Sequence, residues 1–173
     1  MITKQVIEAM KRLKEEYFSI NQKPDANTGI TVGLLDENDI FKWKVVLKGV
    51  NDSPYRNGVF ILIVNIPKDY PNSPPEIHFI KPIYHLNVNP HKPNIPGAEP
   101  LGHVCMSCLN WWKPYYTLKE VFSNIFMFSY MANPDSPYAL NRSDEFRNNR
   151  PLYEEKAKYF TKKYATQHRI LKS

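Results

Sequence analysis

The first twenty residues show the hydrophobic spacing of a helix. Apolar residues recur at steps of three and four from Ile2 to Ile20, which is the spacing of one helix face. Thr3 can cap the first turn. Oppositely charged residues stand four apart on the other face, as in Arg12 and Glu16, so we expect that face to be solvated and to carry local ion pairs. The pattern predicts a helix over residues 2–20.

From Gly29 the spacing changes to that of strands. Short runs rich in β-branched and aromatic residues alternate with Asp, Asn, Pro and Gly. The third run is apolar at nearly every position, so we expect it to be buried on both faces. The runs predict an antiparallel meander of four strands over residues 30–35, 41–48, 58–66 and 76–80.

Helical signals return after a long stretch without periodicity, residues 81–116. Thr117 and Glu120 form a capping box, and apolar residues up to Phe128 then cover most of the helix circumference, which predicts a central, buried helix. A short helix is predicted at about 143–148. A last helix begins at Pro151, whose fixed φ suits a first helical turn. The predicted fold class is α+β: an N-terminal helix, a four-stranded antiparallel meander, a long loop, a central helix and two C-terminal helices, in a single domain over residues 1–173.

The composition agrees with one globular domain. Hydrophobic residues make up 42% of the 173-residue chain, which is enough for a full core and excludes a disordered chain. The longest apolar run, residues 59–64, is far shorter than the roughly 18 residues that span a membrane. The N-terminal helix lacks the apolar core of a signal peptide. We expect a protein of the cytoplasm, the nucleus or both, with no membrane contact.

The formal net charge of +6 is concentrated near the C-terminus. Residues 142–173 hold nine Lys and Arg but only four Asp and Glu. The basic residues alternate with Glu on predicted helix, whereas nucleic-acid proteins more often interleave them with aromatics along a strand or loop. Nucleic acid is therefore not the expected partner.

The two cysteines, Cys105 and Cys108, lie in the aperiodic loop. Loops of this length tend to be functional, and two cysteines this close cannot staple a fold. Four interpretations are open: a redox pair, a zinc site with His85, His91 and His103, two small buried hydrophobes, or a nucleophilic thiol. The redox pair lacks the usual strand-to-helix position, and the histidine spacing matches no zinc finger, so no metal or other cofactor is expected.

Six short motifs follow one another along the chain: Asn51-Asp52-Ser53-Pro54-Tyr55 with Gly58-Val59-Phe60; Pro67-Lys68-Asp69-Tyr70-Pro71 with Pro74-Pro75; Ile83-Tyr84-His85-Leu86-Asn87; Gly102-His103-Val104-Cys105; Trp112-Lys113-Pro114; and Asn133-Pro134-Asp135-Ser136-Pro137. In this order they resemble the ubiquitin-conjugating enzymes, and the resemblance covers nearly the whole chain.

The resemblance implies a fold and an activity. Members of this family take ubiquitin, or a ubiquitin-like protein, from an activating enzyme as a thioester on one cysteine. They pass it to a substrate lysine, usually with a ligase of the RING or HECT type. The motif position implies that Cys105 is this cysteine. Asn87 matches the motif asparagine, whose amide either donates to the developing oxyanion or organises the loop through hydrogen bonds. The resemblance assigns His85 to support of the active-site loop.

The chain departs from the family pattern in three places. Leu86 replaces the proline of the His-Pro-Asn motif and frees a φ angle. Ser107 and Ser136 stand where many members carry acidic residues that help to receive the lysine. A proline-rich insertion, residues 88–101, separates Asn87 from Cys105. These departures leave open a catalytically weak or inactive binding module of the same fold.

The resemblance also marks surfaces for partners. Lys11, Arg12 and Lys14 match the region that meets the activating enzyme. Loops around Asn72 and around Lys113-Pro114-Tyr115 match the ligase-binding surface. The modifier is left open, because Trp112-Lys113-Pro114 and Asn148-Asn149-Arg150 also resemble the branch of the family that carries the ubiquitin-like protein NEDD.

Overall fold

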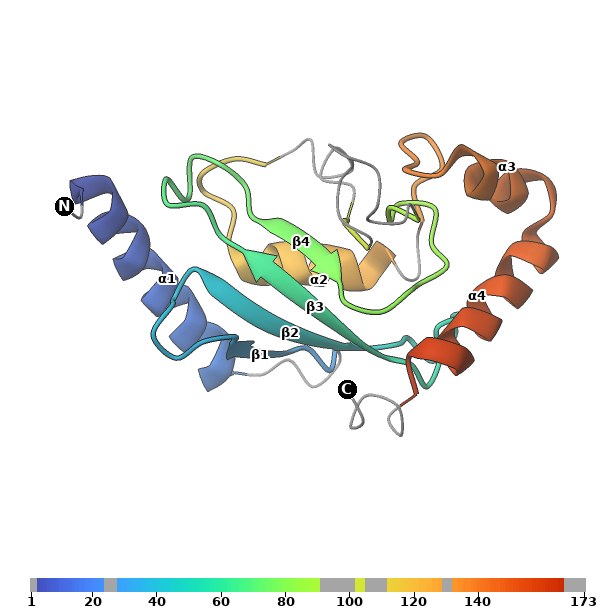
Figure 1. Cartoon of the computed structure of the whole chain (residues 1–173), viewed down its shortest axis with the longest axis horizontal. Helices are drawn as coiled ribbons and strands as arrows, with labels where there is room; N and C mark the ends of the chain where they lie inside the picture. Colours follow the sequence, from blue (N-terminus) through green and yellow to red (C-terminus); the bar gives the residue numbers. More distant parts are fainter. Residues whose placement is uncertain (1–2, 24–27, 91–101, 105–111, 129–131, 167–173) are drawn as a thin grey trace.

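A computed structural model of the chain describes residues 3–23, 28–90, 102–104, 112–128 and 132–166. In these residues four helices accompany one four-stranded sheet (Figure 1). The elements follow the predicted order and confirm the α+β class: α1 (Lys4–Gln22), β1 (Thr31–Leu34), β2 (Lys42–Lys48), β3 (Val59–Asn65), β4 (Glu76–Phe79), α2 (Leu118–Phe128), α3 (Leu140–Asn148) and α4 (Arg150–Tyr164).

The sheet is the predicted antiparallel meander, with strand order β1-β2-β3-β4. Along β2 buried and exposed residues alternate, and Trp43 pairs in register with Val64 of β3. No residue of β3 is exposed, although Val59, Ile63 and Asn65 are only half-buried. The sheet therefore buries one face almost completely and leaves the other partly open.

Trp43 lies at the centre of the core. Its side chain is fully buried, and its ring contacts the rings of Tyr17 on α1 and Phe122 on α2. Figure 1 shows α2 behind the sheet, α1 beside β1, and α3 and α4 together at the opposite end of the molecule. The core therefore joins α1, the sheet and α2, and α4 closes the far end.

Local sequence signals mark the starts of α1 and α2. The Thr3 hydroxyl accepts from the Val6 amide, and Thr117 and Glu120 accept from each other's backbone amides, as a capping box requires. By contrast, α3 begins at Leu140, three residues earlier than about 143. Its N-cap residue, Ala139, makes no side-chain cap, so no local sequence signal marks this start.

The outer face of α1 is not solvated throughout, contrary to the prediction. Glu16 is buried and pairs with the Arg12 Nε atom at 2.8 Å. The Arg12 Nη2 atom donates to the carbonyl of Tyr116 at 2.6 Å, and Glu16 accepts from the Leu118 amide at 2.6 Å. The pair therefore ties α1 to the start of α2.

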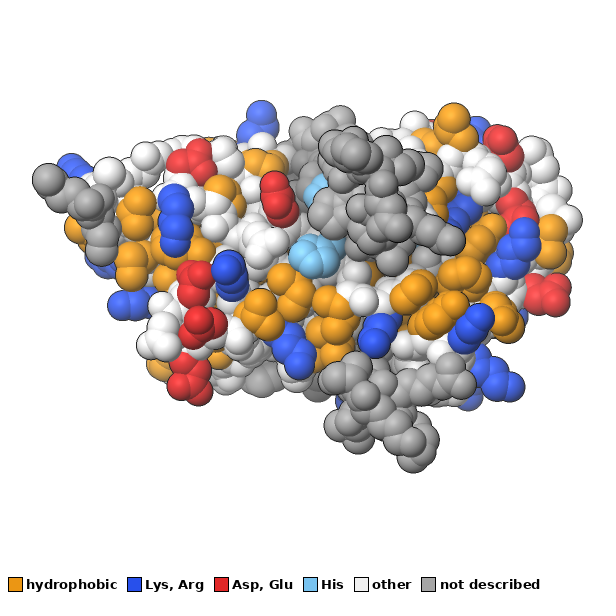
Figure 2. All heavy atoms as spheres, in the orientation of Figure 1, with side chains coloured by type: hydrophobic (Ala, Val, Ile, Leu, Met, Phe, Trp, Pro, Cys, Tyr) orange, Lys and Arg blue, Asp and Glu red, His pale blue; other side chains and the backbone are white. Residues whose placement is uncertain are grey.

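The charges on one face of the molecule are dispersed (Figure 2). On the face shown in Figure 2, Lys and Arg side chains stand among acidic and apolar ones and form no continuous basic patch. None of the described helices is both long enough and apolar enough to cross a membrane.

Candidate active site

Arg142 of α3 fixes the backbone that leads into the motif His85-Leu86-Asn87. Its side chain is buried, and Nη1 donates to the carbonyls of Ile83 at 3.2 Å and His85 at 3.1 Å. The guanidinium lies 4.3 Å from the centre of the Tyr84 ring. Burial lowers the pKa of Arg142, an effect that Tyr84 opposes. One buried cation thus holds two carbonyls of the segment that contains the motif.

His85 is buried and turned toward its own loop. Its Nδ1 atom accepts from the Asn87 amide at 3.1 Å, and its ring lies 5.9 Å from that of Tyr55. A ring nitrogen that accepts a hydrogen bond carries no hydrogen of its own, so Nδ1 is the unprotonated nitrogen of His85. The geometry is that of a residue that fixes the loop.

The Asn87 side chain organises the turn at residues 133–136. Its Nδ2 atom donates to the carbonyls of Asn133 at 2.8 Å and Ser136 at 2.9 Å, and its Oδ1 atom accepts from the Asn133 amide at 2.9 Å. An amide nitrogen carries two hydrogens, and these carbonyls take both. Asn87 is only 1% exposed. Donation to an oxyanion would require one of the two bonds to open.

Ser136 is half-buried and contributes its carbonyl to this turn. The acidic residue beside it, Asp135, is exposed and pairs with Arg147 of α3 at 2.6 Å. Arg147 also donates to the carbonyl of Pro134 at 2.9 Å. The turn is therefore held by Asn87 on one side and by α3 on the other.

The residues that precede Cys105 run antiparallel to those that follow Asn87. Val104 forms a bridge with Val88, and the Asn89 amide donates to the carbonyl of His103 at 2.9 Å. The Val104 amide donates to Ile77 of β4 at 2.8 Å. Two motifs that are far apart in the sequence are thus side by side at Val88 and Val104.

Several predicted site residues lie outside the described residues: Cys105, Ser107, Cys108 and His91, together with insertion residues 91–101. Within the described part of the chain, no group of three His, Cys, Asp or Glu side chains could hold a metal ion. The zinc hypothesis, which needs Cys105 and Cys108, stays untested.

The two loops predicted to meet a ligase are joined by Trp112. Its Nε1 atom donates to the carbonyl of Pro71 at 3.0 Å, and its ring lies 5.8 Å from that of Tyr70. Asn72 and residues 113–115 are exposed on either side, with Tyr115 72% exposed. The two loops therefore form one surface.

On α1, Lys11 and Lys14 are exposed, whereas Arg12 is half-buried. We expect Arg12→Gln to lower the free energy of unfolding by about 1 to 3 kcal/mol, because the buried Glu16 loses its cationic partner and the carbonyl of Tyr116 loses the Arg12 donor. Urea unfolding measures the loss. Lys11→Gln and Lys14→Gln are the matched controls, and a loss of the same size in either would contradict the assignment.

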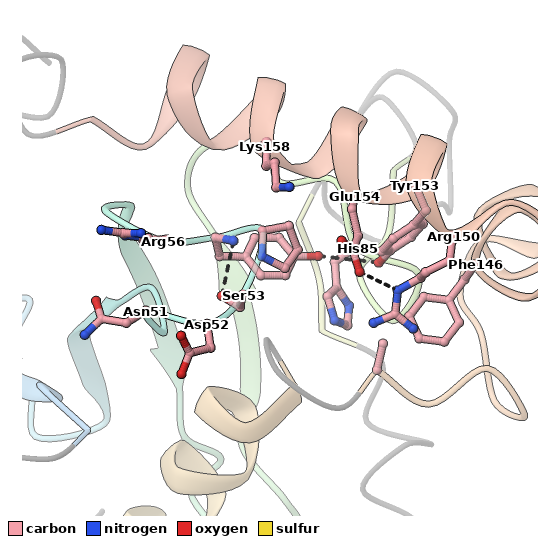
Figure 3. A pocket seen from close by; sticks show the side chains of 13 residues that line it. Asn51, Asp52, Ser53, Arg56, His85, Phe146, Arg150, Tyr153, Glu154 and Lys158 are labelled. Carbon is pink, nitrogen blue, oxygen red and sulfur yellow. Dashed lines mark hydrogen bonds and ion pairs between the residues drawn. The ribbon is translucent and has the colours of Figure 1, made fainter.

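An open cleft of about 540 Å³ lies between residues 51–56 and α4 (Figure 3). Tyr55, His85 and Tyr153 are among its lining residues. Sequence reasoning named neither Tyr153 nor Arg142 as part of the site. In the sequence, Tyr153 is one of the regularly spaced apolar residues of α4, and Arg142 is one of several charged residues of α3. Neither pattern indicates a contact with the motif His85-Leu86-Asn87.

Comparisons with known proteins agree on one family. The family model described as "Ubiquitin-conjugating enzyme" matches residues 12–161. The chain is 34% identical over 168 residues to "Ubiquitin-conjugating enzyme E2 T" of Danio rerio, covering 93% of this chain and 79% of that protein. A crystal structure of a Plasmodium yoelii protein, described as a ubiquitin conjugating enzyme, superposes with a TM-score of 0.78 at 28% identity, covering 92% of this chain and 96% of the other. The chain therefore belongs to the ubiquitin-conjugating enzyme family.

Proposed function

We propose that the chain carries ubiquitin or a ubiquitin-like protein as a thioester on Cys105. The observation that supports this most is the antiparallel pairing of Val104 with Val88, which brings the residue before Cys105 next to the segment that begins at Asn87. Family membership supports the chemistry, because these enzymes work through a cysteine thioester.

The reaction has two steps. The Cys105 thiolate attacks the thioester carbonyl that joins the modifier to the activating enzyme, forms a new carbon–sulfur bond and releases the activating enzyme's thiolate. A lysine amine of the substrate then attacks the Cys105 thioester. The carbon–nitrogen bond forms, the carbon–sulfur bond breaks, and the nitrogen gives up a proton. With serines at 107 and 136, we propose that a partner's group or solvent takes that proton.

The surfaces of the described residues support partners of three kinds. Exposed Lys11 and Lys14 on α1 suit the activating enzyme, and the surface formed by Asn72 and residues 113–115 suits a ligase. A substrate lysine would approach the turn at 133–136, where Asn87 fixes the backbone.

Charging with a panel of activating enzymes tests this function and identifies the modifier. We expect ATP-dependent formation of an adduct that dithiothreitol removes, with ubiquitin or with NEDD. A reaction without ATP is the control. If no modifier gives an adduct while the chain still binds a ligase or ubiquitin, the protein is a non-catalytic binding module and the proposal fails.

A further inference from the structure

The backbone amide of Leu86, in the middle of the motif, donates to the hydroxyl of Tyr153 at 3.3 Å. Leu86 is 0% exposed and Tyr153 is 2% exposed, so water does not reach this amide. Tyr153 lies on α4, 67 positions away in the sequence. We propose that Tyr153 is a positioning residue of the active site, which holds the Leu86 peptide and through it Asn87; this inference rests on the proposed function.

The amide needs an acceptor because it is buried. A buried N–H without a partner costs about 1 to 3 kcal/mol, and backbone amides in protein interiors are almost always paired. A proline at this position would carry no N–H and would fix φ by its ring. Leucine brings an additional donor and a free φ angle, and the Tyr153 hydroxyl both satisfies the donor and restrains the peptide.

Tyr153 is in turn held by Tyr55. Their hydroxyls lie 3.4 Å apart, and the Tyr55 hydroxyl donates to the carbonyl of Tyr84 at 2.8 Å. Because the Tyr55 proton goes to Tyr84, Tyr153 is the donor between the two hydroxyls. The three hydrogen bonds therefore form a chain in which every donor points the same way. The Leu86 amide donates to Tyr153, Tyr153 donates to Tyr55, and Tyr55 donates to the carbonyl of Tyr84.

These hydroxyls are protonated at neutral pH, as tyrosines ordinarily are, and burial extends this to higher pH. Burial raises the pKa of Tyr55 well above its usual value, with a further contribution from Tyr153, and it also raises the pKa of Tyr153. Both groups can therefore donate at neutral pH. Figure 3 shows Tyr153 extending from α4 beside His85, at the side of the cleft that adjoins the motif.

Leu86 is also held at its carbonyl, which belongs to the next peptide unit along the chain. Its carbonyl accepts from the amides of Tyr138 at 2.8 Å and Ala139 at 3.1 Å. The next residue, Asn87, bonds to the turn at 133–136. Without the Tyr153 contact, the peptide unit between His85 and Leu86 loses a hydrogen bond at its N–H, and this loosens the backbone that leads into Asn87.

A double-mutant cycle tests the inference. We expect Tyr153→Phe to slow discharge of the charged enzyme to free lysine by about tenfold, since the Leu86 amide loses its acceptor, with a smaller change in charging. In the Leu86→Pro background no amide proton exists, so Tyr153→Phe should change discharge by less than about threefold. Tyr159→Phe, at an exposed position of the same helix, is the matched control and should leave both rates unchanged.

Equal slowing by Tyr153→Phe in both backgrounds would overturn the inference. A second measurement needs neither activity nor the proline variant. Hydrogen exchange of the Leu86 amide should be accelerated in Tyr153→Phe by at least about tenfold more than exchange of the core amides of β3, which report any change in global stability. Unchanged exchange at Leu86 would also overturn it. If exchange responds but no protein forms an adduct, the proposed function has failed and the contact stands.

Discussion

Cys105→Ser is expected to abolish the adduct that dithiothreitol removes, whereas Cys108→Ser should form it at the wild-type rate. A cysteine thiol has a pKa of about 8.5 and supplies some thiolate at neutral pH. A serine hydroxyl stays protonated and attacks the thioester poorly. Any product formed on the substituted hydroxyl would be an oxygen ester, which dithiothreitol does not remove. Non-reducing gels, with and without dithiothreitol, distinguish the two bonds.

Comparing Cys105→Ser with Cys108→Ser controls for effects of the substitution on folding as well as on the chemistry. Each substitution exchanges sulfur for oxygen at one of two nearby positions, so similar unfolding midpoints are expected for both variants. Loss of the adduct in Cys108→Ser with retention in Cys105→Ser would reverse the assignment. Loss in both, with unchanged stability, would indicate that the two thiols act together and would return the redox and zinc interpretations to consideration.

Gly102→Ala is expected to lower the free energy of unfolding by about 2 to 5 kcal/mol, since strain and overpacking combine at this position. Gly102 has a φ of +81°, which favours glycine, and an added Cβ would lie 2.2 Å from the carbonyl oxygen of Phe79. That oxygen belongs to β4 and cannot rotate away. Because Val104 and Cys105 lie only two and three positions after Gly102, slower charging is expected together with the loss of stability. Urea unfolding and single-turnover charging measure the two effects.

Gly33→Ala is the matched control for this substitution. Gly33 lies in β1, and an added Cβ would meet no atom within 4 Å. We expect its stability to remain within about 0.5 kcal/mol of the wild type and its charging to be unchanged. A loss of equal size in both variants would show that replacing a glycine, rather than the clash with Phe79, is responsible.

Local patterns in the sequence were sufficient for most of the fold. The spacing of apolar residues located the helices and strands, and Thr117 with Glu120 marked the start of α2, because these signals depend on neighbours in the chain. The start of α3 was missed, because its N-cap residue, Ala139, has no side-chain oxygen to accept from the first turn and is held instead by its amide, which donates to the carbonyl of Leu86. Long-range contacts of this kind leave no local pattern.

The motifs of the site could be predicted from the sequence, but the hydrogen bonds that connect them to the rest of the fold could not. The order of the motifs pointed to His85, Asn87 and Cys105. Arg12 and Arg142 read as ordinary members of charged helices, yet each directs its guanidinium to carbonyls far away in the sequence. The pattern of charges alone cannot distinguish a cation that faces water from one that satisfies buried carbonyls.

The base of the insertion is closed by backbone bonds. Asn89 donates to His103 and accepts from Gly102, while Phe79 donates to Gly102, so residues 89 and 102 meet at the edge of the sheet. For a loop whose ends are already held together, the entropic cost of added length grows only logarithmically. The chain between these residues can therefore change in length and sequence during evolution while Val88 and Val104 stay in place. A longer or shorter segment between residues 89 and 102 is therefore expected to change the free energy of unfolding by little.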